Sequence, residues 1–204
     1  MTAHAHLEDL DRIRVGALTW RPVRERLGAT AFGVNAWTAD AVGDEVIESH
    51  TEGTSSSPGH EELYLVVAGR ATFTVGEEEI DAPVGTLVHV EVGTLRSAVA
   101  AEPATTVLVI GGEPGAAGPR SAWEYYYAAQ PAYDAGDYEQ AIAIAGEGLR
   151  DWPEHGPLNY QLACFNALAG RLDEARAHLE VALANDERAR GWAADDEDLA
   201  ALRS

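Results

Sequence analysis

The chain has 204 residues, of which 46% are hydrophobic and 24% are charged, a balance that is typical of globular proteins and excludes a disordered or fibrous one. Its formal net charge is −20 and both halves are acidic, so no basic face is available for binding nucleic acid. At about 150 residues per domain, the length leaves room for two small domains.

The sequence lacks the signals of membrane insertion and export. No window approaches the roughly 18 uninterrupted apolar residues of a membrane span, and the start, MTAHAHLEDLDRIRVG, is acidic where a signal peptide is basic and then apolar. We therefore expect a cytoplasmic protein. Lysine is absent while Ala, Gly and Arg are plentiful, a bias typical of GC-rich bacterial genomes. The single cysteine, Cys164, lies in an apolar helical pattern and is predicted to be buried.

The first half of the chain has the pattern of short strands. From about Val15 to Gly112, alternating or β-branched runs are separated by Gly, Asp, Pro and Ser. In RATFTVGEEEIDAPVG, Ala71, Phe73 and Val75 alternate with threonines before a glycine-led turn, which predicts a β-hairpin. Strands of this length and spacing favour an antiparallel sandwich or barrel.

The pattern changes after a break between the two halves. Residues 112–122, GEPGAAGPRSA, have neither period, so we predict two domains, 1–115 and 116–204. Beyond the break, apolar residues recur at helical spacings of three and four. A shift of 34 residues superposes the turn and small residues Gly136 on Gly170, Ala141 on Ala175 and Gly148 on Ala182. This period is typical of tetratricopeptide-like helical hairpins.

Residues 122–190 resemble two tetratricopeptide units. The second unit matches the family pattern well, whereas the first departs from it at Ala128 and Ala132. The resemblance implies an α-helical domain that binds a protein partner. Because such stacks normally need about three repeats, we expect the acidic end GWAADDEDLAALRS to cap the stack with Trp192, Leu199 and Leu202.

The strand region resembles the cupin superfamily. In GHEELYLVVAGRATFTV, Glu62 precedes Gly69 by seven residues, as in the first cupin motif, and Gly85 and Gly93 match the second, GTLVHVEVGTLR. The resemblance covers roughly residues 30–112. It implies an RmlC-like jelly roll, that is, a cupin-type antiparallel β-barrel ahead of the helical segment. It further implies a small molecule bound in the barrel and a homodimer.

The resemblance fails at the metal ligands. Metal-binding cupins have a His-x-His pair before the glutamate and a further histidine in the second motif. Here the paired positions fall on Ser56 and Pro58, or on Ser55 and Ser57 with a longer spacing, and the second-motif position is Arg96. The standard four-ligand site therefore cannot be assembled from these residues.

Two alternatives remain for Glu62. His60 and Glu62 share one face of a strand and His50 ends the preceding strand, so these three could bind one divalent metal, zinc, iron or nickel, with His89 joining from the opposite strand. Alternatively, Arg96 pairs with Glu62 and neutralises its charge where relatives hold a metal.

The sequence thus supports two functional hypotheses. In the first, a cupin without a metal binds a small molecule, with Trp37, Glu62, Tyr64, His89 and Arg96 lining the barrel, while the repeats bind a protein. In the second, the chain is a metal-dependent enzyme of oxygenase or isomerase type that uses His50, His60 and Glu62. Fold alone cannot choose between these hypotheses.

Overall fold

The computed structural model describes residues 4–53 and 59–203, and the chain divides into two compact units, Met1–Ala117 and Gly118–Ser204. The predicted boundary lay two residues earlier. The first unit is built of antiparallel strands and the second of helices, so the predicted fold class is confirmed. No helix in the described part of the chain is long and apolar enough to cross a membrane.

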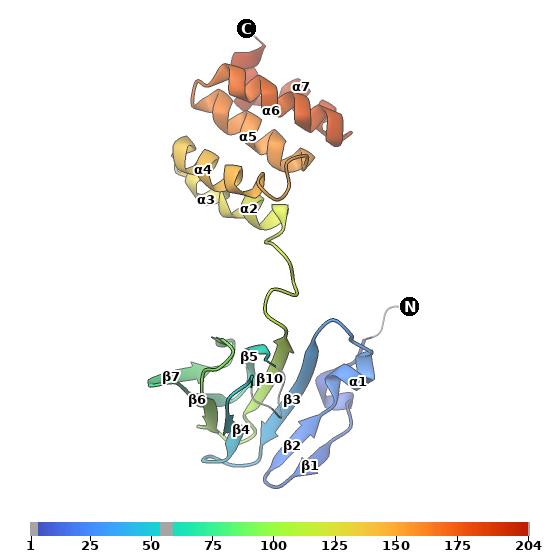
Figure 1. The fold of residues 1–204 in the computed structure, drawn as a ribbon, viewed down its shortest axis with the longest axis vertical. Helices are drawn as coiled ribbons and strands as arrows, with labels where there is room; N and C mark the ends of the chain where they lie inside the picture. The colour runs from blue at the N-terminus through green and yellow to red at the C-terminus, as the bar shows by residue number, and fades with distance from the viewer. Residues whose placement is uncertain (1–3, 54–58, 204) are drawn as a thin grey trace. The chain divides into compact units, whose positions relative to one another are not determined.

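The N-terminal unit consists of short strands with two small helical turns (Figure 1). Its elements are η1 (Leu7–Asp9), β1 (Ile13–Val15), β2 (Leu18–Arg21), α1 (Val23–Leu27), β3 (Gly33–Ala39), β4 (Glu45–His50), β5 (Glu61–Ala68), β6 (Arg70–Val75), β7 (Glu78–Pro83), β8 (Leu87–Val90), β9 (Arg96–Ala100) and β10 (Thr106–Gly112).

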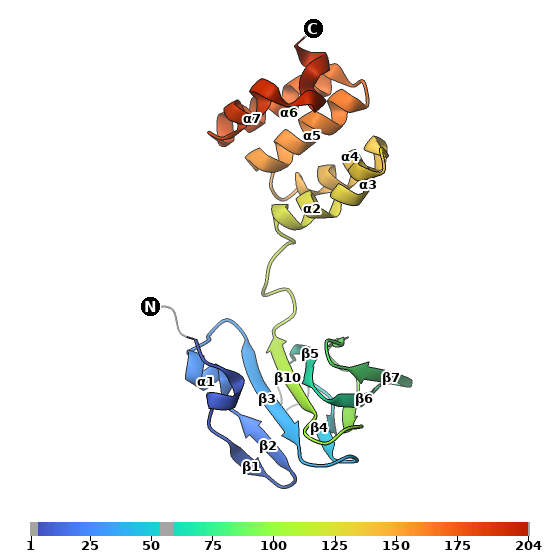
Figure 2. The same cartoon turned by 180° about the vertical axis from the view of Figure 1, so that it is seen from behind.

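These strands form two antiparallel sheets, with the orders β1-β2-β3-β10-β5-β8 and β4-β9-β6-β7. Consecutive strands repeatedly change sheet, as the path from β3 to β6 shows in Figure 1 and, from behind, in Figure 2. Among the described strands the two sheets do not join into one closed ladder. The unit is therefore a jelly-roll sandwich rather than a continuous barrel.

Alternation along the strands places the main core between the sheets. Tyr64 and Val66 of β5, Phe73 of β6 and Ala98 of β9 are fully or almost fully buried in one cluster. The predicted hairpin is present, because β6 pairs with β7 in the register Phe73↔Ile80 after a two-residue turn. One face of each sheet is thus committed to the interior, and the cavity described below opens into it.

The outer face of the larger sheet is covered as well. Ala36 of β3 and Leu108 and Ile110 of β10 point away from the main core and pack with Leu10 and Val23 from the N-terminal segment. Both faces of β3 and β10 are therefore in contact with protein.

The helical unit consists of paired helices joined by tight turns. Its elements are α2 (Ala122–Ala128), α3 (Gln130–Asp134), α4 (Tyr138–Gly148), α5 (Gly156–Leu168), α6 (Leu172–Asn185), α7 (Ala189–Asp195) and η2 (Glu197–Leu202). Ser121 and Glu124 form a capping box at the start of α2. The turns after α3 and α5 contain Gly136 and Gly170 in the left-handed region, so each ends a helix at the predicted position.

The acidic end of the chain packs back onto α5. Leu199 of η2 is 1% exposed and shares a cluster with Cys164, which is buried as predicted. Leu202 packs against the same cluster, so the two leucines of the expected cap lie where the sequence placed them. Trp192 does not contribute to this core, because its side chain remains 38% exposed at the surface of α7.

Candidate functional site

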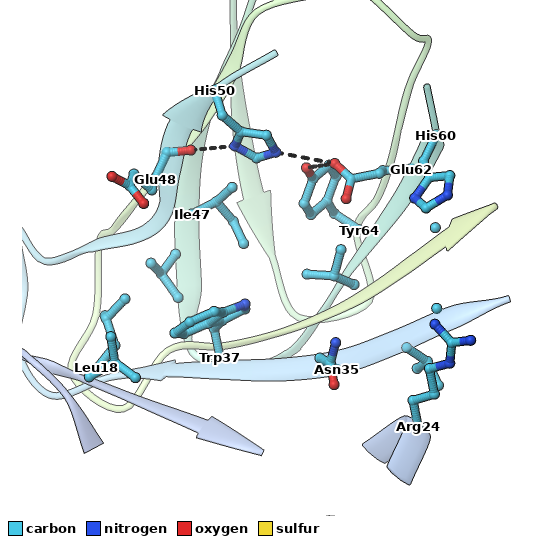
Figure 3. A pocket seen from close by; sticks show the side chains of 16 residues that line it. Leu18, Arg24, Asn35, Trp37, Ile47, Glu48, His50, His60, Glu62 and Tyr64 are labelled. Carbon is cyan, nitrogen blue, oxygen red and sulfur yellow. Dashed lines mark hydrogen bonds and ion pairs between the residues drawn. The ribbon is translucent and has the colours of Figure 1, made fainter. Parts of the chain in front are cut away.

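A cavity of about 460 Å³ lies in the N-terminal unit between the two sheets. Figure 3 shows His50, Glu62 and Tyr64 on one side of it and Trp37 and Asn35 across from them. The apolar part of the wall consists of Val15, Leu18, Val34, Trp37, Val46, Ile47 and Val109, and the polar part of Arg24, Asn35, Glu48, His50, His60, Glu62 and Tyr64. Two of these polar side chains, His50 and Tyr64, contact Glu62.

Glu62 and Tyr64 lie two residues apart on β5 and face the interior together. The Tyr64 hydroxyl donates a short hydrogen bond to Oε2 of Glu62. Burial, reinforced by this hydrogen bond and the negative charge of Glu62, raises the pKa of Tyr64 above its ordinary value. The hydroxyl is therefore protonated at neutral pH and acts as a fixed donor to the carboxylate.

Arg96 approaches the same carboxylate from the other sheet. It is the first residue of β9, a central strand, and its side chain is 0% exposed. Its Nε lies 3.6 Å from Oε2 of Glu62, and no atom in the described part of the chain forms a hydrogen bond with Nε, Nη1 or Nη2. The structure thus brings together a fully buried guanidinium and the largely buried carboxylate of Glu62, which is its ionic partner.

His50 is oriented by the backbone of its own strand. Its Nδ1 lies 2.6 Å from the Glu48 carbonyl oxygen, which can only accept, so Nδ1 carries the proton. The other nitrogen, Nε2, lies 3.4 Å from Oε2 of Glu62 and 3.9 Å from Oε1 of Glu52. His50 consequently presents one ring nitrogen to two carboxylates.

The resulting group of possible metal ligands differs from the predicted one. Single ligand atoms of His50, Glu52 and Glu62 lie within 4.8 Å of one another, whereas His60 is not part of this group although it lines the cavity. Glu52 was missed in the sequence, where its position two residues after His50 was the available signal. The positions of the lost His-x-His pair, Ser55 to Pro58, lie outside the described residues.

Two of the predicted wall residues, Arg96 and His89, do not line the cavity. Arg96 is fully buried beside Glu62. His89 lies on β8 between Val88 and Val90, whose side chains are 4% and 1% exposed and fill the interior. Alternation therefore turns His89 outward, where it is 54% exposed and lies 3.5 Å from Glu61. It neither lines the cavity nor joins the metal-ligand group. Trp37 lies in the cavity wall, with its ring centroid 6.4 Å from that of Trp20.

One family model matches part of the chain. Residues 132–203 match the family model for the tetratricopeptide repeat, which confirms that part of the prediction. No curated protein matches the chain.

Several solved cupin structures are similar to slightly more than half of the chain. An RmlC-like cupin from Shewanella frigidimarina is 17% identical, with 56% of this chain and 96% of that one covered and a TM-score of 0.42. An RmlC-like cupin from Desulfovibrio desulfuricans is 23% identical, with coverages of 55% and 96% and a TM-score of 0.43. A predicted oxalate decarboxylase from Thermotoga maritima is 12% identical, with coverages of 54% and 97% and a TM-score of 0.44. These values are too low to carry an argument about ligand or activity.

Proposed function

We propose that the N-terminal unit binds a small polar molecule in its cavity without the standard cupin metal, and that the helical unit binds a protein partner. The observation that carries the first part is the position of Glu62. Its carboxylate is in the cavity wall, held by Tyr64 and beside the buried charge of Arg96. A fixed carboxylate of this kind accepts hydrogen bonds from a ligand with little loss of conformational freedom.

The wall indicates the chemistry of the ligand. Trp37 supplies an aromatic surface, and Asn35, Glu62 and His60 supply hydrogen-bonding groups around it. The cavity volume lies within the usual range of about 300–1,000 Å³ for small-molecule sites. These features suit a molecule of the size of a monosaccharide or an amino acid, with hydroxyl or amino donors for the carboxylate and one apolar face for the indole ring.

A metal-dependent enzyme is the second candidate, and the grouping of His50, Glu52 and Glu62 is the observation in its favour. Two features oppose it. Oε2 of Glu62 already accepts the Tyr64 hydroxyl, and the Arg96 guanidinium lies 3.6 Å away, so its positive charge repels a divalent cation at this oxygen. The residues present therefore fit a metal poorly, and we rank this candidate second.

Ligand binding is tested by thermal unfolding of the full chain in the presence of monosaccharides, sugar acids and amino acids. A ligand at 100 times its Kd stabilises by about 2.7 kcal/mol, which raises the Tm of a domain of this size by roughly 10 °C. We expect at least one compound to raise the Tm of the wild type but not that of Glu62→Gln, each measured against its own ligand-free protein. The control is His89→Gln, which changes a side chain on the outer surface and should respond like the wild type. A compound that stabilises Glu62→Gln as strongly as the wild type would contradict the assigned role of Glu62.

The two candidates are separated by elemental analysis of protein supplemented with zinc, iron or nickel. We expect no stoichiometric metal in the wild type. If metal is present, His50→Ala should remove it whichever ligand set is correct. His60→Ala should remove it only if the ligands are the set predicted from the sequence, His50, His60 and Glu62, and not the group seen in the structure. Stoichiometric metal that is lost in His50→Ala would reverse our ranking.

The proposed protein-binding role of the helical unit is supported by the tetratricopeptide match and by the arrangement of its helices. Units of this kind are helical hairpins stacked side by side, which leave an extended surface for partners. Large aromatic side chains remain exposed on this unit, among them Trp123 at 42% and Tyr127 at 66%. Exposed aromatic residues are enriched where proteins bind one another.

A further inference from the structure

A second pocket lies entirely within the helical unit. It has a volume of about 400 Å³ and is lined by Tyr126, Pro157, Tyr160, Trp192 and Asp196. Three of these five residues are aromatic, one is proline and one is a carboxylate. The lining contains no cationic side chain.

The aromatic walls come from three helices and are fixed by their neighbours. Tyr160 of α5 and Trp192 of α7 meet edge to face, with ring centroids 5.2 Å apart. Tyr126 of α2 is held through its main chain, because its carbonyl oxygen accepts a hydrogen bond of 3.0 Å from Nε2 of the buried Gln161. The rings are thus supported by ordered structure rather than exposed singly.

The carboxylate of Asp196 is fixed as well. Its Oδ2 accepts a hydrogen bond of 2.8 Å from the Tyr160 hydroxyl, and the Cys164 thiol donates to the same oxygen at 3.7 Å. Its Oδ1 accepts the backbone N–H of Asp198. All three donors are neutral, and Asp196 forms no ion pair in the described part of the chain. A negative charge is therefore held beside three aromatic rings, and no cationic side chain lines the pocket.

This combination selects for positive charge. The faces of aromatic rings are negative, so a cation within about 6 Å of a ring centroid is attracted, and a nearby carboxylate adds to the attraction. The surrounding unit carries 16 acidic residues and seven arginines, so its mean field favours cations too. An acidic ligand would be repelled by the Asp196 carboxylate and by the negative charge of the unit.

The unit already uses its aromatic rings in this way. Cζ of Arg188 lies 5.2 Å from the centroid of the Trp192 ring, and Cζ of Arg120 lies 4.4 Å from that of Tyr125. Arg188 is paired with Asp186 at 2.8 Å and lines a neighbouring pocket, so it leaves the second pocket itself without a cation.

We propose that this pocket binds a cationic side chain, arginine or lysine, of a partner polypeptide. The inference rests on the proposed protein-binding role of the helical unit and specifies the chemistry of the partner. A polypeptide is favoured over a free cation because the aromatic surface continues beyond the pocket. Trp123 lies 5.4 Å from Tyr126 and stacks on the exposed Tyr127, which offers contacts for the residues that flank the bound side chain.

The test uses the full chain and a fluorescently labelled nine-residue peptide of glycine and serine with three arginines. Its matched control has citrulline, a neutral isostere, at the same three positions. We expect the arginine peptide to bind, with the citrulline peptide at least tenfold weaker by fluorescence anisotropy. In ¹H–¹⁵N spectra of the wild type, the indole signal of Trp192, assigned with Trp192→Phe, should move on addition of the arginine peptide.

Variants locate the binding. Trp192→Ala and Asp196→Asn should each weaken the arginine peptide at least fivefold, and Trp192→Phe, which keeps an aromatic face, should recover part of the loss. The matched control is Trp152→Ala, because Trp152 is 39% exposed on the same unit but lies outside the pocket. Circular dichroism of each variant establishes that the helices are retained.

The outcomes are distinct. Equal binding of the citrulline peptide at Trp192 would overturn cation recognition while leaving a peptide-binding role for the unit. Binding of the arginine peptide that is unchanged in Trp192→Ala and Asp196→Asn would show general attraction to an acidic protein and overturn the pocket. If neither peptide binds or shifts any signal of the helical unit, both the inference and the protein-binding role it rests on fail.

Discussion

The buried pair of Glu62 and Arg96 makes a quantitative prediction about the stability of the N-terminal unit. Breaking a buried ion pair by removing one partner costs about 3–5 kcal/mol, because the remaining charge stays in a medium of low polarity. Replacing both partners with apolar residues of similar size is often neutral. We therefore consider Arg96→Met, Glu62→Leu and the double variant.

The two single variants are expected to differ. Glu62 is 13% exposed and accepts the Tyr64 hydroxyl, so its charge is partly compensated without Arg96. Arg96→Met should therefore lower the free energy of unfolding by about 3 kcal/mol. After Glu62→Leu, Arg96 is fully buried and its nitrogens have no hydrogen-bond partner in the described part of the chain, so the loss should approach about 5 kcal/mol. The double variant should stay within about 1–2 kcal/mol of the wild type.

The assay is urea unfolding of the full chain, with peptide-resolved hydrogen exchange over β5 and β9 to assign the transition to the N-terminal unit. The coupling energy is the cost of the double variant subtracted from the sum of the two single losses. On the figures above it is at least about 6 kcal/mol. Additive losses, with a coupling below about 0.5 kcal/mol, would show that the two charges do not interact and would refute the reasoning.

Two further predictions concern single positions. Gly69 and Gly76 both have left-handed backbones, but a Cβ at Gly69 would lie 2.7 Å from Cα of Thr105 and one at Gly76 would meet nothing within 4 Å. In urea unfolding, Gly76→Ala should lower the free energy of unfolding by about 1 kcal/mol and Gly69→Ala by clearly more. Equal losses in the two variants would contradict the close contact with Thr105 as the cause. The neutral ring of His155 caps α5 by accepting a backbone N–H, and burial lowers its pKa. Protonation of His155 therefore favours the unfolded state, so the contribution of this cap to stability should be complete above about pH 6.5 and should be lost as the pH falls further. In a series of thermal melts from pH 7.5 to 5, the Tm of His155→Asn should fall less than that of the wild type.

Much of the fold was predictable because its signals are local. The alternation around Phe73 and the glycine-led turn after it specify a hairpin from neighbouring residues alone. The 34-residue period located the helical hairpins in the same way, since Gly136 and Gly170 end helices by their own backbone preference. The capping role of the two leucines in the acidic end was predictable, but the position of Trp192 was not. The hydrophobicity of a side chain alone does not show whether it is buried in a core or forms part of a surface pocket.

The site was predictable only in part, and His89 shows why. In LVHVEV the flanking valines are the apolar set, and the structure buries them, so the same alternation that identified the strand also turns His89 outward. The chemistry of its imidazole suggests a site residue, whereas its position in the alternation of the strand places it on the outer face. Glu52 was missed for a different reason, because it lies after the end of β4, where strand alternation no longer shows which side chains share a face with His50.

The role of His50 depends on the orientation of its ring as well as on its residue type. A histidine beside two carboxylates resembles a metal site in sequence and in distance, yet its function depends on which nitrogen faces them. The Glu48 carbonyl holds the proton on Nδ1 and leaves Nε2 toward Glu62. That arrangement suits a metal ligand and a hydrogen-bonding group for a small molecule equally well, so it does not decide between them. Arg96 favours the small molecule, because a buried guanidinium supplies at Glu62 the positive charge that a metal would otherwise supply, and the carboxylate can still accept from a neutral ligand.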